Sequence, residues 1–585
     1  MQTESENKVI VIIGHRGVGK SELARRLQHY DHNADFVDLD DEIEKKINKR
    51  ITEIFIDHGE AYFRNLEKQV CLEIFQKVQR TTYICTGAGL ELDLIPASAH
   101  VLWVRRNTDS EGRIFLDRPR LDAAIKPLEE FQKRYAIREP SYRNKYTQIY
   151  DLPEGDFQQK FLAQDIEKKL LSGHQNSNAK ASIGGGLTLM PEFFQSQRWG
   201  FLQKYFLYLN PTFFELRNDL LSAEQMSMAA EIFTAAKCLF SFRRENTKEQ
   251  QSFFEQNKKH LWAVDWDYEL GFWPQDFEQL PLILSCHNLD WDFMNKVPSN
   301  VKWIKFAPLV QNFTDLKKAH DWSLKNPQQN QFLPRSLNGR WLWYRLLKKN
   351  INAINFWKYG EGSALDQPSL FEWMVVPTDF KNFAAILGDP VAHSWTPLEQ
   401  SDFFNQRQSP VFKIQIHKEE FAEAFPVVQA MGLQWAAVTA PLKQSLFPNK
   451  SINTLSWLNG EWHSTSTDEQ GFADLLEGLE SVAPLQSQIA VWGGGGTLDI
   501  MKKVIPKAYF FSARSGDLKF DAGQVPQDYN PVVVVWAAGS GPSIQWPAED
   551  WTPRVVVDLS YKEDSTAREY ALKKVAMYIS GKKMF

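Results

Sequence analysis

A glycine-rich segment near the amino terminus has the residue types that bind phosphate groups. Five apolar residues from Val9 lead into Gly14-His15-Arg16-Gly17-Val18-Gly19-Lys20-Ser21, and a helical pattern follows. In such a turn between a strand and a helix, backbone N–H groups surround the phosphates, the lysine adds positive charge and the serine hydroxyl binds Mg²⁺. The segment predicts a nucleotide site formed by Gly14, Gly17, Gly19, Lys20 and Ser21.

Two carboxylates at the end of the next predicted strand indicate what happens to the phosphate. Asp38 and Asp40 in "ADFVDLDDEIEKK" are two residues apart, so they lie on the same face of a strand. One carboxylate can serve the metal ion while the other accepts a hydroxyl proton. Phosphoryl transfer depends on this kind of positioning and charge neutralisation more than on covalent help.

The segments "GEAYFRNLEK", "TGAGLE", "DRPRL" and "REPSY" follow in an order and spacing that resembles shikimate kinase across nearly the whole first block. The resemblance implies ATP and Mg²⁺, with Asp40 contacting the reacting hydroxyl and Asp38 near the metal. It further implies that Arg64 and Arg138 bind the shikimate carboxylate, that Gly87 and Gly89 line the acceptor site, and that Arg118 lies on a lid over the phosphates.

A lysine at the end of a later apolar strand could act as an amine nucleophile. Lys305 ends the strand in "VKWIKFAP". An unperturbed lysine has a pKa of about 10.4 and is almost wholly charged at pH 7, but a dry strand end makes it a better nucleophile toward ketones. The flanking segments "FFELRNDLL", "SFRREN", "DYEL", "LSCHN" and "GSALDQP" have an order that resembles type I 3-dehydroquinate dehydratase.

This second resemblance implies that Lys305 forms a Schiff base with the substrate ketone. It also implies that His287 moves protons during the elimination of water, which suits an imidazole. Contacts to dehydroquinate are implied for Glu215, Arg217, Arg243, Arg340, Ser363 and Gln367. The block has about 190 residues, whereas a (β/α)₈ barrel usually has about 250, so we expect a trimmed barrel.

The third block contains "AILGDPVAHSWTPLEQSDFF", "AAVTAPLKQS", "INTL", "STDEQG" and "WGGGGTLDIM", which resemble shikimate dehydrogenase. The resemblance makes Lys443 and Asp468 the catalytic pair. Chemically, such a pair can relay a proton to the carbonyl oxygen as hydride reaches the carbon. Shikimate binding is implied for Ser394, Thr396, Thr439 and Asn453.

A glycine turn in this block indicates a dinucleotide. Gly493, Gly494, Gly495 and Gly496 lie between a predicted strand and helix, where a pyrophosphate would bind. Arg514 ends the next predicted strand, at about the ~20-residue spacing expected for the residue that selects the ribose. Arginine at this position favours the 2′-phosphate, so we expect NADPH rather than NADH.

Three departures leave the activity of the third block open. Ala437 stands where the family usually has asparagine, and Ser466 replaces the asparagine of the usual Asn-Thr-Asp. The family also continues into a helix with a substrate-binding glutamine, which is absent after "SGKKMF". Each lost hydrogen bond costs on the order of 1 kcal/mol. Weak reduction, an altered substrate or a shortened gene product are therefore alternatives.

Length and composition indicate a soluble multidomain protein. The 585 residues suggest three or four domains of about 150 residues each. The 67 basic and 72 acidic residues give a net charge of -5, without the basic face that nucleic-acid binding needs. No apolar run approaches the ~20 residues of a membrane span. The four cysteines form no C-x-x-C pair, and "MQTESENK" is no signal peptide, so we expect a cytoplasmic location.

The predicted fold class is α/β multidomain. We expect a P-loop kinase domain (1–172), a linker (173–186), a trimmed (β/α)₈ barrel (187–377), and a two-lobed α/β reductase. The reductase would have a substrate lobe (378–482) and a Rossmann-like NADP lobe (483–585) that is short at its carboxyl end.

The order of the three blocks resembles the last three modules of the fungal AROM polypeptide. It implies a multifunctional enzyme of small-molecule substrates that converts 3-dehydroquinate to shikimate 3-phosphate, with a homodimer as one open arrangement. A regulator like the fungal quinate-pathway repressors is one alternative, and a kinase and dehydratase with a degraded reductase is another. Retention of catalytic residues favours an enzyme: Lys20, Asp40, Arg64, Arg138, His287, Lys305, Lys443 and Asp468.

Overall fold

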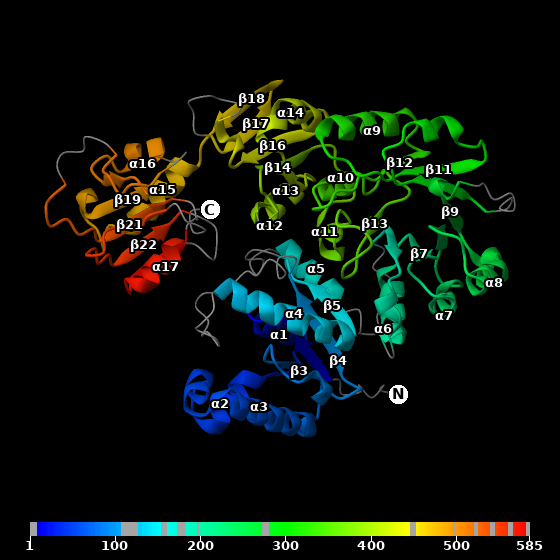
Figure 1. Ribbon diagram of the computed structural model, residues 1–585, viewed down its shortest axis with the longest axis horizontal. Helices are drawn as coiled ribbons and strands as arrows, with labels where there is room; N and C mark the ends of the chain where they lie inside the picture. The colour runs from blue at the N-terminus through cyan, green and yellow to red at the C-terminus, as the bar shows by residue number, and fades with distance from the viewer. Residues whose placement is uncertain are drawn as a thin grey trace.

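The computed structural model describes residues 9–106, 127–153, 161–171, 183–195, 198–271, 280–392, 394–444, 452–494, 498–519, 525–538, 544–559 and 566–580. These residues form four sheets that follow one another along the chain (Figure 1). Within the same ranges, no helix combines the length and the apolar character that crossing a membrane requires.

The first sheet is parallel and has the order β2-β3-β1-β4-β5. Its strands are β1 (Val9–Ile13), β2 (Asp35–Asp38), β3 (Thr82–Cys85), β4 (His100–Arg105) and β5 (Gln148–Asp151). Its helices are α1 (Lys20–Tyr30), α2 (Leu39–Ile47), α3 (Ile51–Lys77), α4 (Pro127–Lys145) and α5 (Phe161–Leu171). Because β1 is central, the loop after it opens at the carboxyl edge of the sheet, where ligands of such folds bind.

The second sheet has eight parallel strands in the order β12-β11-β10-β9-β8-β7-β6-β13. They are β6 (Gly186–Thr188), β7 (Phe213–Arg217), β8 (Cys238–Phe242), β9 (Ala263–Asp267), β10 (Leu282–Cys286), β11 (Val301–Phe306), β12 (Asn330–Phe332) and β13 (Phe356–Trp357). The helices around it are α6 (Arg198–Leu209), α7 (Ala223–Ala229), α8 (Lys248–Asn257), α9 (Phe313–Lys325), α10 (Leu342–Leu347) and α11 (Leu370–Val375).

This curled sheet confirms the prediction of a trimmed barrel. The connection from β10 to β11 contains only a short 3₁₀-helix, Asp292–Lys296. The end strands β12 and β13 are short, and they do not pair with each other through backbone hydrogen bonds. Side chains cross the seam instead, since Asn352 Nδ2 donates to Phe332 O at 3.0 Å and Ile354 N donates to Gln331 Oε1 at 3.4 Å.

The third block has two lobes, as predicted. The first has the mixed order β15-β14-β16-β17-β18 and contains β14 (Phe383–Gly388), α12 (Thr396–Glu399), α13 (Ser401–Asn405), β15 (Val411–Gln415), α14 (Phe421–Ala430), β16 (Leu433–Val438), β17 (Thr454–Leu458) and β18 (Glu461–Thr465). The second has the parallel order β20-β19-β21-β22-β23 and contains α15 (Asp468–Glu477), β19 (Ile489–Gly493), α16 (Leu498–Val504), β20 (Tyr509–Phe511), β21 (Val533–Ala537), β22 (Val555–Asp558), α17 (Thr566–Lys573) and β23 (Met577–Ser580).

The barrel contacts both neighbouring blocks, as Figure 1 shows. On one side, the buried Arg198 of α6 donates to Tyr146 O and Arg143 O, both at 2.7 Å, at the end of α4. On the other side, Arg340 contacts Glu420 beside α14. The α/β multidomain prediction is thus confirmed, and the first barrel strand begins at Gly186, one residue before the predicted boundary.

Candidate active sites

The phosphate-binding loop joins β1 to α1 in a conformation that needs glycine. Gly14, Gly17 and Gly19 have φ angles of 149°, 78° and 99°, which L side chains avoid. The buried ammonium of Lys20 donates to Gly14 O and to His15 O, both at 3.0 Å. The turn and its lysine are therefore already arranged around the position where phosphates bind in such loops.

Ser21 and Asp38 bring two oxygen groups together beside this loop. Ser21 Oγ donates to Asp38 Oδ2 at 2.7 Å, and Asp38 Oδ1 accepts from Asp40 N at 3.0 Å as the cap of α2. Mg²⁺ at nucleotide sites uses one or two protein oxygens together with the substrate phosphates. The pair therefore fits Mg²⁺ bound with a nucleotide. The expected lid residue, Arg118, lies outside the described residues.

Asp40 lies next to this pair and has an unusual acidity. Burial raises the pKa of Asp40 to about 6, and the charge of Asp38 acts in the same direction, while the charge of Lys20 opposes it. A carboxylate with a pKa close to neutrality is a better proton acceptor than an ordinary aspartate. The residues of this site could thus bind phosphate, hold a metal ion and accept a proton.

Two glycines beside Asp40 lie in close contact with charged side chains. A Cβ on Gly89 would come within 2.5 Å of Arg64 Nη2, and a Cβ on Gly87 within 2.6 Å of Glu67 Oε1. Arg64 Nη1 donates to Glu67 Oε2 at 2.6 Å. Burial lowers the pKa of Arg138, and the charge of Arg64 acts in the same direction. Neighbouring guanidinium groups favour an anion such as a carboxylate.

In the barrel, Lys305 at the end of β11 lies in a buried ionic cluster. Its Nζ donates to Asp265 Oδ2 at 2.7 Å and lies 3.8 Å from Glu215 Oε1. Arg243 Nη2 donates to the same Asp265 oxygen at 2.5 Å. Burial lowers the pKa of Lys305, and the charge of Arg243 adds to this, whereas Asp265 opposes it. The lysine therefore loses its proton more easily than an exposed lysine.

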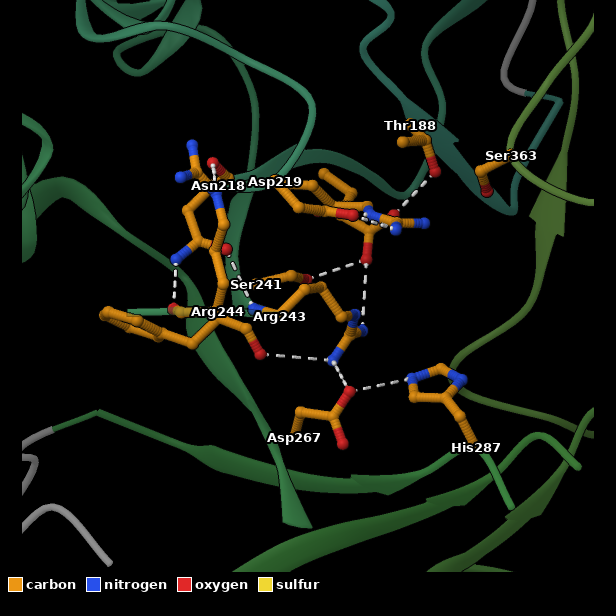
Figure 2. Close-up of polar contacts among 12 residues, drawn as sticks. Thr188, Asn218, Asp219, Ser241, Arg243, Arg244, Asp267, His287 and Ser363 are labelled. Carbon is orange, nitrogen blue, oxygen red and sulfur yellow. Dashed lines mark hydrogen bonds and ion pairs between the residues drawn. The ribbon is translucent and has the colours of Figure 1, made fainter. Parts of the chain in front are cut away.

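The other carboxylate of this cluster is held by hydroxyl groups. Glu215 accepts hydrogen bonds from Thr188 Oγ1 at 2.5 Å and from Ser241 Oγ at 2.7 Å. Arg217, at the end of the same strand, donates twice to Asp219, at 3.0 and 2.6 Å. Figure 2 shows Thr188, Asp219 and Ser241 around Arg243.

His287 follows β10 and faces Asp267, as Figure 2 shows. Its Nε2 lies 3.6 Å from Asp267 Oδ2, and Arg243 Nη1 lies 3.8 Å from the same oxygen. Burial lowers the pKa of His287 well below its ordinary value, and the charges of Arg243 and Lys305 act in the same direction. The imidazole is therefore neutral at physiological pH and can accept a proton from a ligand.

The loop between β13 and α11 contributes Ser363 and Gln367. Gln367 Oε1 accepts from Ser363 N at 2.8 Å, and Gln367 Nε2 donates to Ser363 Oγ at 3.1 Å. Figure 2 draws Ser363 together with the cluster at the strand ends. The loop is therefore organised by its own polar side chains near the candidate site.

The structure places Arg340 elsewhere, which corrects its assignment to dehydroquinate. Its guanidinium contacts Glu420 and donates to Gln415 O at 3.1 Å, so it joins the barrel to the third block. Arg335 is the arginine at the strand ends, and it donates to His287 O at 2.8 Å. Both arginines lie in one short irregular segment after β12, where residue spacing alone does not tell which one faces inward.

In the third block, Lys443 and Asp468 meet although 25 residues separate them. Lys443 Nζ donates to Asp468 Oδ2 at 2.8 Å, and Asn453 Nδ2 donates to Asp468 Oδ1 at 2.7 Å. Asn453 Oδ1 also accepts from Thr467 N at 3.0 Å. An ammonium fixed by a carboxylate can pass a proton to an oxygen atom beside it.

The remaining expected residues of the first lobe lie in neighbouring segments. Ser394 Oγ donates to Thr396 Oγ1 at 3.1 Å near α12. Thr439, after β16, donates its N–H to Leu387 O at 2.9 Å. Ser466 Oγ, where the dehydrogenase pattern has asparagine, is buried with no hydrogen-bond partner.

The glycine turn after β19 fits the close approach of a dinucleotide. Gly493 and Gly494 have φ angles of 100° and 127°, and a Cβ on Gly493 would come within 2.6 Å of Ala538 N. Arg514 is exposed beyond the neighbouring strand β20. Lys519 Nζ donates to Gly493 O at 2.7 Å and adds a cation that the sequence analysis missed. Gly495 and Gly496 lie outside the described residues.

Asp265, Glu67 and Arg335 also escaped the sequence analysis. Asp265 had a usable signal, because it is a charged residue within the buried strand "AVDWD", and buried charges need partners. Glu67 and Arg335 had no such signal, since each lies among other charged or polar residues. Their roles depend on side-chain direction.

Comparison with known proteins identifies a relationship for the first block. The family model for shikimate kinase matches residues 16–171. The shikimate kinase of Staphylococcus aureus (strain Newman) is 32% identical over 139 residues, which are 23% of this chain and 78% of that protein. The enzyme of strain JH9 is 33% identical over 135 residues, or 22% and 75% of the two chains.

Solved structures match other parts of the chain. Dehydroquinate dehydratase and shikimate dehydrogenase from S. pombe AroM covers 68% of this chain and 93% of its own, with 16% identity and a TM-score of 0.28. Shikimate dehydrogenase from Aquifex aeolicus covers 35% and 88%, with 23% identity and a TM-score of 0.28. These scores and identities are low, so the sequence relationship of the first block alone establishes a family.

Proposed function

This chain belongs, through its amino-terminal block, to the shikimate kinase family, and we propose that the block phosphorylates shikimate with ATP. The observation that carries the proposal is the position of Asp40, beside the Ser21–Asp38 pair and close to Gly87 and the Arg64–Glu67 ion pair. Lys20 and the glycine turn would hold the phosphates. Arg64 and Arg138 would bind the carboxylate of shikimate.

Asp40 would accept the proton of the attacking hydroxyl. Its pKa of about 6 leaves it mostly ionised at pH 7 yet basic enough for this role. Bound Mg²⁺ would supply charge neutralisation at the phosphates, with Ser21 and Asp38 as its protein ligands. Asp40→Asn should abolish phosphorylation while ATP still binds, measured by a coupled assay and by calorimetry. An Asp40→Asn variant at full rate would refute the role.

For the barrel, we propose dehydration of 3-dehydroquinate through a Schiff base. The buried position of Lys305, together with its lowered pKa, supports this reaction. Neutral Nζ would add to the ketone carbon, and water would leave to give an iminium. His287 would then take a proton from the neighbouring carbon and give it to the departing hydroxyl group, which leaves as water. Hydrolysis would return Lys305 and release the product.

Borohydride reduction in the presence of 3-dehydroquinate tests this proposal. It should add one ligand mass to the peptide that contains Lys305. Lys348 and Lys349 are internal controls, because burial lowers the pKa of each to about 8 without placing them in the cluster. Label on those two lysines with none on Lys305 would contradict the mechanism.

We propose that the third block reduces 3-dehydroshikimate with NADPH. Lys443 and Asp468 would hold the proton that goes to the carbonyl oxygen, which their 2.8 Å contact supports. NADPH would supply the hydride, with Gly493, Gly494 and Arg514 as residues that hold it.

A chain with kinase and dehydratase activity and an impaired reductase is the second candidate. Ser466 favours it, because it stands where the dehydrogenase pattern has asparagine, and each lost hydrogen bond costs on the order of 1 kcal/mol. NADPH oxidation with purified 3-dehydroshikimate separates the two candidates. Turnover supports the complete enzyme, and binding of NADPH without turnover supports the second candidate.

A further inference from the structure

A chain of charged side chains crosses from the barrel to the phosphate-binding loop of the kinase block. Its first member is Glu361, in the loop between β13 and α11 (residues 358–369, called the bridging loop). Glu361 Oε1 accepts from Arg143 Nη2 at 2.5 Å and from Arg105 Nη2 at 3.1 Å. Arg143 belongs to α4 and Arg105 ends β4, so one barrel carboxylate joins two elements of the kinase sheet.

On the kinase side, this chain ends at the lysine of the phosphate-binding loop. Arg143 Nη2 also donates to Glu139 Oε1 at 2.9 Å, and Glu139 Oε2 bonds His15 Nε2 at 2.8 Å. The side chain of His15 is only 3% exposed. The carbonyl oxygen of His15 accepts from Lys20 Nζ at 3.0 Å. Two side chains, Arg143 and Glu139, thus connect Glu361 to His15, whose carbonyl oxygen holds the Lys20 ammonium.

On the barrel side, Glu361 is coupled closely to Ser363 and Gln367. Gly360 and Gly362 flank it with φ angles of 75° and 70°. A Cβ on Gly362 would come within 2.7 Å of Gln367 Oε1, the same atom that accepts from Ser363 N at 2.8 Å. The backbone next to Glu361 therefore lies against the Ser363–Gln367 pair.

Glu361 also separates two like charges. Burial opposes the ionisation of Glu361, but the charge of Arg105 and the hydrogen bond from Arg143 lower its pKa, so it remains a carboxylate. The charge of Arg105 in turn acts against the protonated state of Arg143. Without the carboxylate, the two guanidinium groups would repel each other, and Arg143 would keep only its contacts to Glu139 and Glu192.

We propose that Glu361 is a positioning residue of the kinase, supplied by the barrel, and that it couples ligand binding at the barrel to ATP binding at the phosphate loop. The coupling part rests on the functions proposed above for the two blocks. Because such coupling is reciprocal, ATP changes the affinity of the barrel for its ligand by the same factor.

Kinase kinetics of the full chain test the positioning role. Glu361→Gln should raise the KM for ATP by roughly three- to ten-fold with little change in kcat, as expected for a partly exposed charge network. Glu420→Gln is the matched control, because it removes a carboxylate from the other barrel interface, and it should leave the KM for ATP unchanged. An unchanged KM for ATP in Glu361→Gln would overturn the proposal.

A second variant shows whether Glu361 acts through Arg143. Arg143→Met should raise the KM for ATP, and adding Glu361→Gln to it should have almost no further effect, because residues acting in one network are not additive. Fully additive effects would contradict the chain of contacts. The melting temperature of each variant separates loss of positioning from loss of folding.

The coupling is tested by filling the barrel covalently. Borohydride treatment with 3-dehydroquinate should change the KM for ATP of the wild type but not that of Glu361→Gln, relative to protein treated with borohydride alone. Equal changes in both proteins would overturn the coupling. If mass spectrometry shows no adduct on Lys305, the proposed dehydratase fails instead, and the Glu361→Gln kinetics still decide the positioning role.

Discussion

Replacing Gly89 by alanine tests the proposed shikimate site without changing any charged group. The added Cβ would come within 2.5 Å of Arg64 Nη2, 2.8 Å of its Cζ and 2.9 Å of its Nη1. The whole guanidinium must therefore move. It lies at the far end of a flexible side chain, so the fold can tolerate the change while the position that binds a carboxylate is lost.

The expected magnitude follows from the lost contact. A hydrogen bond to a charged group contributes about 1.5–3 kcal/mol, which corresponds to a rise in the KM for shikimate of about 10- to 150-fold. The KM for ATP should stay constant, because the phosphate loop is untouched. A coupled kinase assay with each substrate varied in turn measures both values.

Gly200 provides the matched control for this substitution. It lies in α6, and a Cβ there would meet nothing within 4 Å. Gly200→Ala should therefore leave both KM values unchanged. If Gly89→Ala bound shikimate within about two-fold of the wild type, Arg64 would not be the carboxylate ligand and the reasoning would be refuted.

Four further predictions follow from the sites. The kcat for phosphorylation should fall about tenfold per pH unit below pH 6, because burial raises the pKa of Asp40 to about 6 and its carboxylate must be ionised to accept a proton. A kcat that stays constant from pH 5 to 7 would contradict this. Asp265→Asn should lower the free energy of unfolding by about 3–5 kcal/mol by removing the carboxylate that Lys305 and Arg243 share, and Lys305→Met in the same chain should restore part of it; equal melting temperatures would count against the buried pair. The lowered pKa of His287 means that, below about pH 6.5, the unfolded chain binds a proton that the folded chain does not, so the free energy of unfolding should fall by up to about 1.4 kcal/mol per pH unit. In His287→Gln, the free energy of unfolding, measured with urea at pH 6.5 and 5.5, should change less between the two pH values. Lys443→Met should lower the kcat for 3-dehydroshikimate reduction by about 100-fold or more without changing NADPH affinity, and a normal rate would remove Lys443 from the chemistry.

The backbone architecture could be predicted because its signals are local. Short stretches of sequence predict the glycine loop before α1 and the apolar strands of the barrel, and the order of these stretches indicates the three blocks. The family resemblance implied that Lys443 and Asp468 form a pair, and in the structure Lys443 Nζ donates to Asp468 Oδ2 at 2.8 Å. Periodicity alone does not bring residues from separate segments together.

Side-chain direction and contacts between blocks could not be predicted. Arg340 and Arg335 lie five residues apart in one irregular segment, and packing against the third block turns Arg340 away from the strand ends. Asp265 is buried between Lys305 and Arg243, which only the curled sheet brings together. Glu361 resembles any exposed acid in the sequence, and its partners belong to another block.

The most direct test of the central claim is product analysis with the full chain. The purified protein would receive 3-dehydroquinate, ATP, Mg²⁺ and NADPH, and mass spectrometry would identify what accumulates. Shikimate 3-phosphate is the expected product. Unchanged 3-dehydroquinate, together with failure to phosphorylate added shikimate, would contradict it.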